Sequence, residues 1–128
     1  MRILRSLFRK SASVNEMVVV STFETTLKAF KKAPLPTQMH VGKRILADIN
    51  SLAHMTPQNL RASQQQAIQK YRDLRNLALK NGATNDRDPE YAYAALMESF
   101  ALSMTDADVG AMIGGQLMQW LASIHVVE

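Results

Sequence analysis

Helix-start signals recur along this sequence, and they constrain its fold more than any other feature does. Ser13-Val-Asn-Glu16 is a capping box, in which the Ser hydroxyl and the Glu carboxylate each bind a backbone amide. Thr56-Pro57 and Asp88-Pro89 each place an oxygen-bearing cap before a proline at the first helical position. Thr105-Asp-Ala-Asp108 opens the last helix with carboxylates in its first turn. The signals predict a chain of successive helices.

Helix-end signals lie between these starts. Pro34 and Pro36 end the helical pattern after Ala33 and allow Pro36 near the next helix start, and Asn81-Gly82 supplies a glycine cap. The β-branched stretch Met17–Phe23 could form a strand, but no second clear strand exists to pair with it, so we expect a helix. The expected helices span residues 2–12, 14–33, 37–55, 57–81, 89–104 and 106–125.

Composition supports one helical domain. The chain has 128 residues, 47% of them apolar and 20% charged, which is typical of a protein with a packed core. We expect an all-α, single-domain bundle of about five helices over residues 13–128, preceded by a basic amphipathic N-terminal helix over residues 1–12. The uncharged stretch Val109–Val127 contains two glutamines, a serine and a histidine, so we expect a core helix there and not a membrane span.

The sequence contains no recognisable chemistry. It has no cysteine, which excludes disulfides and Cys-containing metal sites and fits a reducing, cytoplasmic location. No phosphate-binding loop, dinucleotide-binding glycine pattern or nucleophile motif occurs. His40 and His54 lie near opposite ends of one expected helix, roughly 20 Å apart, and cannot share a metal within one chain. We therefore expect no enzyme activity, no cofactor and no small-molecule substrate.

Charge is strongly segregated along the chain. Residues 1–80 carry 14 Lys and Arg against four Asp and Glu, whereas residues 81–128 carry one basic residue against seven acidic ones. The balances of +10 and −6 sum to the modest net charge of +4. Such a distribution suits a basic surface for nucleic acid or anionic lipid, or complementary faces for self-association.

The N-terminal segment, which we call the arm (residues 1–12), combines an apolar face with basic residues. In a helix, Ile3, Leu4, Leu7 and Phe8 share one side. The arm is a candidate for docking on protein or on a membrane surface, through Arg2, Leu4, Arg5, Leu7, Phe8, Arg9 and Lys10. Its Arg- and Ser-rich, acid-free composition also resembles a mitochondrial presequence, which leaves mitochondrial and peripheral membrane locations open.

Residues 49–61 resemble the turn and second-helix start of helix-turn-helix proteins. That resemblance implies a nucleic-acid-binding element within residues 49–75, although His54 stands where the sharp turn usually has glycine. The side chains suited to base edges and phosphates are Gln58, Asn59, Arg61, Gln65, Lys70, Arg72 and Arg75. The alternative is an ordinary solvated helix face.

Gly110-Ala-Met-Ile-Gly114-Gly115 is the last feature. Three glycines in a helix cost about 1 kcal/mol each relative to alanine, so we expect close packing against a neighbouring helix as compensation. Gly110, Gly114 and Met118 are the candidate contact residues, and the expected neighbour is intramolecular, with a partner chain as the alternative.

Taken together, these observations favour a non-enzymatic helical interaction protein that binds a protein partner or self-associates. Nucleic-acid binding is the alternative, and peripheral membrane association is the second alternative.

Overall fold

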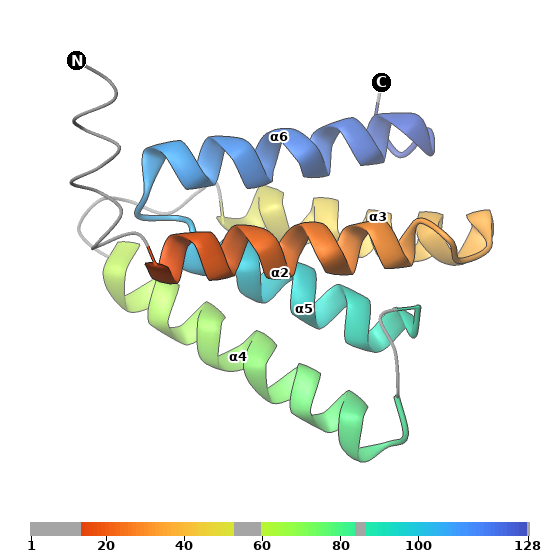
Figure 1. Cartoon of the computed structure of the whole chain (residues 1–128), viewed down its shortest axis with the longest axis horizontal. Coiled ribbons are helices and arrows are strands. Elements are labelled where there is room, and N and C mark those ends of the chain that lie inside the picture. The colour runs from red at the N-terminus through yellow and green to blue at the C-terminus, as the bar shows by residue number, and fades with distance from the viewer. Residues whose placement is uncertain (1–13, 53–59, 84–86, 128) are drawn as a thin grey trace.

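The computed structural model describes residues 14–52, 60–83 and 87–127, and this part of the chain is helical without a strand. The helices are α2 (Val14–Phe30), α3 (Leu35–Leu52), α4 (Leu60–Lys80), α5 (Pro89–Leu102) and α6 (Ala107–Ser123). Consecutive helices run in alternating directions (Figure 1). The start of α2, the end of α3, the start of α4, the end of α5 and the start of α6 therefore lie at the same end of the bundle. The all-α bundle expected from the sequence is confirmed, and the stretch Met17–Phe23 is helical.

Helix α5 lies at the centre of the bundle. It packs against each of the other four helices, and α4 is its most extensive neighbour. Every residue from Ala92 to Ser99 is buried. Three of the first seven residues after Glu90 are Ala, so neighbouring helices can approach the α5 backbone closely. An ordinary surface helix has one apolar stripe, whereas α5 has no solvent-facing stripe over these two turns.

The core is one continuous cluster with side chains from all five described helices. Phe23, Leu27 and Phe30 are buried, and their spacing of four and three residues places them on one face of α2. Trp120 is a core anchor: its ring lies edge-on to Phe30 with centroids 6.0 Å apart, and its indole nitrogen donates to Gln38 Oε1 at 2.9 Å. A fully buried indole needs such an acceptor.

Helix termini agree with the sequence signals at several positions. Asp88 caps α5 by accepting from the amides of Glu90 and Tyr91, with Pro89 at the first helical position. Gly82 follows the end of the helix expected over residues 57–81 and lies in the left-handed region, with φ of 101°. The cap of α6 is Asp106, one residue after the Thr105 with which the pattern begins. The capping box at Ser13 and the Thr56-Pro57 start lie outside the described residues.

Helices α2 and α5 end two or three residues earlier than expected, and a buried glutamine from another helix binds the backbone at each of these ends. Helix α2 ends at Phe30 instead of Ala33, and Gln38 Nε2 donates to the carbonyls of Lys31 and Ala33 in the following turn. Gln64 is the one polar amide on the buried, otherwise apolar side of α4 beside Ala67, Ile68 and Tyr71, and it donates to Ala101 O at 2.9 Å at the end of α5. Each amide satisfies carbonyl groups that a helix end leaves without an intrahelical donor.

Candidate interaction surfaces

The polar side of α4 makes an internal ion-pair cluster with α5. Glu98 is a buried carboxylate on the central helix, and Arg72 Nε donates to its Oε2 at 3.1 Å. Arg75 Nε lies 3.1 Å from Oε1 as an ion pair, but without hydrogen-bonding geometry. The two guanidinium groups neutralise a carboxylate that would be strongly destabilising if it were buried alone. Both arginines therefore have a structural role.

This cluster bears directly on the residues proposed for nucleic acid. Arg61, Gln65 and Lys70 are exposed on α4, whereas Arg72 and Arg75 are bound to Glu98. The ammonium of Lys70 lies 5.2 Å from the centroid of the Tyr71 ring. Gln58 and Asn59 lie outside the described residues. The described part of the basic surface is therefore less continuous than the sequence pattern suggests.

A second polar cluster joins α3, α4 and α5. Tyr71 donates to Asp48 Oδ2 at 2.7 Å, and the hydroxyl of Tyr93 donates to the same oxygen. The guanidinium of Arg44 stacks on the Tyr93 ring, 3.9 Å from its centroid, and Arg44 Nη1 also binds the Glu90 carboxylate at 3.0 Å. Three helices are thus tied together through one carboxylate.

The protonation of this cluster follows from its environment. Burial, followed by the hydrogen bond to Asp48, raises the pKa of Tyr71 well above its usual value of 10.0. The same two causes raise the pKa of Tyr93 to about 12. Both phenols remain protonated donors at neutral pH, so the cluster clamps the helices together and does not hold a phenolate base. A polar recess of about 230 Å³ lies beside it, between Asp48, Ser63 and Lys70.

The outward surface of α6 has a different character. We use the term α6 face for its exposed, uncharged residues Met112, Gly115, Met118, Gln119 and Ala122. Met112 and Met118 are 49% and 43% exposed. After Asp108 in its first turn, α6 contains no charged residue. Helices α2, α3 and α4 each have at least one exposed charged residue beyond the first turn, and α5 is almost wholly buried.

The glycines of α6 do not share one packing role. A Cβ at Gly110 would lie 3.0 Å from the carbonyl oxygen of Ser103, so the turn before α6 approaches this position closely. A Cβ at Gly114 or Gly115 would meet nothing within 4 Å. The expected intramolecular helix neighbour is therefore absent at Gly114 and Gly115 in the described structure. The tight helix contact is at Gly42 of α3, where a Cβ would lie 2.9 Å from Leu121.

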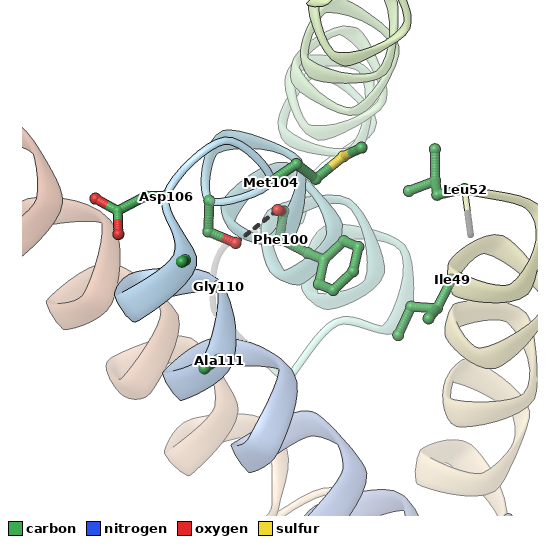
Figure 2. Close-up of a pocket in the computed structure, with 9 residues that line it drawn as sticks. Ile49, Leu52, Phe100, Met104, Asp106, Gly110 and Ala111 are labelled. Carbon is green, nitrogen blue, oxygen red and sulfur yellow. Dashed lines mark hydrogen bonds between the residues drawn. The ribbon is translucent and has the colours of Figure 1, made fainter. Parts of the chain in front are cut away.

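Helices α3 and α6 meet near Gly42 but leave a groove between their opposite ends. We call this the α3–α6 groove, and it has a volume of about 340 Å³. Figure 2 shows Ile49 and Leu52 of α3 facing it from one side, Gly110 and Ala111 of α6 from the other, and the Phe100 ring at its floor. Met104 and Asp106 complete the end nearest the start of α6.

The remaining candidate features are the arm, a metal site and a membrane-spanning helix. The arm residues Arg2, Leu4, Arg5, Leu7, Phe8, Arg9 and Lys10 lie outside the described part of the chain. Within that part, no three His, Asp or Glu side chains are grouped closely enough to hold a metal ion. None of the described helices combines the length and apolar character needed to cross a bilayer.

Comparison with known proteins adds no relative. No protein-family model matches the chain, and neither a curated protein nor a solved structure does so.

Proposed function

We propose that this chain is a helical interaction protein that self-associates through the α6 face. The observation that carries the proposal is the open space around Gly114 and Gly115 on a helix whose other side is buried in the core. Each glycine lowers helix stability by about 1 kcal/mol relative to alanine. No contact within the described chain compensates for this loss, but the close approach of a second backbone would.

The chemistry of the α6 face supports this proposal. Met112 and Met118 present adaptable apolar side chains that lose water on association. They flank Gly115, so a partner helix could approach the backbone between them. Methionine is also among the residues enriched at protein interfaces.

The absence of charge favours a second copy of the same chain as the partner. In a two-fold symmetric dimer, a surface patch meets itself, so any charge near the symmetry axis faces a like charge. The α6 face has no charged residue and avoids this repulsion. The outward face of α4, in contrast, would bring the exposed Arg61 and Lys70 toward their own copies.

Sedimentation equilibrium of the full chain from about 1 μM to about 1 mM tests the proposal over the affinity range of weak to moderate dimers. We expect the average mass to rise with concentration, and we expect Met118→Glu to abolish the rise by placing two carboxylates opposite each other. Met17→Glu is the matched control, because Met17 is an exposed methionine (60%) on α2, a different helix from the one that carries the α6 face. A chain that stays monomeric throughout, or equal effects of the two substitutions, would refute the proposal.

A further inference from the structure

The α3–α6 groove is an apolar recess at the end of the bundle where α2 begins (Figures 1 and 2). Ile49, Leu52, Phe100 and Met104 are only partly buried, although each packs against the core on its other side. Partly exposed large side chains that converge on one recess mark a docking surface more clearly than scattered ones do. The recess therefore suits an apolar helix face.

We propose that the occupant of the groove is the arm of the same chain, residues 1–12. In a helix, Ile3, Leu4, Leu7 and Phe8 form an apolar face whose character matches the four partly buried groove residues. The arm is thus an intramolecular ligand that completes the open end of the bundle.

Charge complementarity favours the arm over a generic apolar partner. The arm contains Arg2, Arg5, Arg9 and Lys10 and no acidic residue. Asp106 lines the groove, and Asp108 is exposed on the same first turn of α6. A docked arm brings its cations near these two carboxylates while its apolar side faces Phe100.

Chain connectivity permits this placement. In the docked arm the helix needs to include only Ile3 to Phe8, which carry its apolar face, and the chain after Phe8 is extended. The six Cα–Cα steps from Phe8 to Val14 then span up to about 20 Å. Two helices packed side by side have axes about 8–10 Å apart. A linker of this length therefore lets the arm reach about two helix widths away from the start of α2. Because the arm is tethered, its effective concentration at the groove is on the order of millimolar, and even weak docking is then substantially populated.

Disulfide trapping tests the proposal in the full chain, which has no cysteine of its own. We expect the pair Ile3→Cys and Ala111→Cys to form an intramolecular bridge at least about tenfold faster than the pair Ile3→Cys and Ala122→Cys, because a bridge requires Cα atoms within about 7 Å. Ala122 is the matched control, as it is exposed on the same helix three turns away from the groove. Equal rates would overturn the proposal.

Thiol labelling provides a second readout that does not require bridge formation. In the full chain carrying only Ala111→Cys, we expect the additional substitution Leu7→Asp to accelerate labelling by a water-soluble maleimide severalfold. With Ala122→Cys, the same substitution should have no effect. If Leu7→Asp leaves the labelling rate of the Ala111→Cys variant unchanged, the proposal is overturned. It is also overturned if the chain floats with anionic vesicles, loses this binding on Leu7→Asp, and forms no bridge between residues 3 and 111.

Both experiments use the Met118→Glu background at about 1 μM, and the bridge is detected within the monomer. Their outcome is therefore independent of self-association through the α6 face.

Discussion

Replacing Gly115 by alanine should stabilise the monomer and weaken self-association at the same time. A Cβ at Gly115 or Gly114 meets nothing within 4 Å, so the substitution gains helix propensity of about 1 kcal/mol without a steric penalty. For a chain of this size, that gain raises the melting temperature by about 3–4 °C. In the proposed dimer, however, the added methyl group separates two backbones that meet at this glycine.

The neighbouring Gly110 is an internal control on the same helix. A Cβ there would lie 3.0 Å from the Ser103 carbonyl oxygen, a backbone atom that cannot move without displacing the turn. We therefore expect Gly110→Ala to give no stabilisation or a net loss, because the propensity gain is offset by this contact.

The assay has two parts. Urea unfolding of dilute protein in the Met118→Glu background measures the free energy of the monomer, and sedimentation equilibrium of the single glycine variants measures association. We expect the dimer to weaken about tenfold for Gly115→Ala, equivalent to about 1.4 kcal/mol. If Gly115→Ala destabilises the monomer, the description of Gly115 as a residue facing open space is wrong. If it stabilises the monomer but leaves association unchanged, the glycine is not at the interface.

Three further predictions concern the core. Gln64→Leu should destabilise the fold by about 1–3 kcal/mol, because the Ala101 carbonyl loses its shorter hydrogen bond and keeps the one from the Met104 amide at 3.3 Å. Gln65→Leu, at an exposed neighbour, should change little, and urea unfolding compares the two variants. Glu98→Gln should lower the free energy of unfolding by about 1–2 kcal/mol, since it leaves two partly exposed arginines without their carboxylate. An unchanged urea midpoint would contradict the structural role of this ion-pair cluster. Because the pKa of Tyr93 is raised from 10.0 to about 12, the folded chain retains a proton that the unfolded chain releases. The free energy of unfolding should therefore be constant below about pH 10 and fall as the pH rises toward 12, and it should fall less steeply in Tyr93→Phe. Denaturant titrations at stepped pH measure this dependence. Identical dependence of the unfolding free energy on pH in both proteins would refute the contribution of Tyr93.

The helices could be predicted well because local signals encode them. Asp88 and Pro89 act through neighbouring amides and a fixed backbone angle, so their effect requires no knowledge of the fold. The end of α2 was harder to predict, because Gln38 binds carbonyls of the turn from within the next helix. The one-residue shift from Thr105 to Asp106 arose because either oxygen-bearing side chain can cap a helix.

The interaction surfaces were only partly predictable. The sequence identified Gly110, Gly114 and Met118 as candidates, but spacing alone could not distinguish a glycine facing Ser103 from one facing open space. The cluster around Asp48 was missed altogether, because Tyr71 and Tyr93 lie on two other helices, 23 and 45 residues away along the chain. Gln64 did leave a signal: a polar residue in an apolar seam indicates a buried hydrogen bond.

The central position of α5 has a consequence for the order of folding. Helices α2, α3 and α4 pack more extensively on α5 than on one another, yet α5 follows all three in the sequence. During synthesis from the N-terminus, these three helices emerge before the surface that orders them exists. Their apolar faces must remain exposed, or covered by other molecules, until residues 89–102 leave the ribosome. Fragments that stop before Pro89 should consequently fail to form a cooperative core, and the nascent chain is most vulnerable to aggregation in that interval.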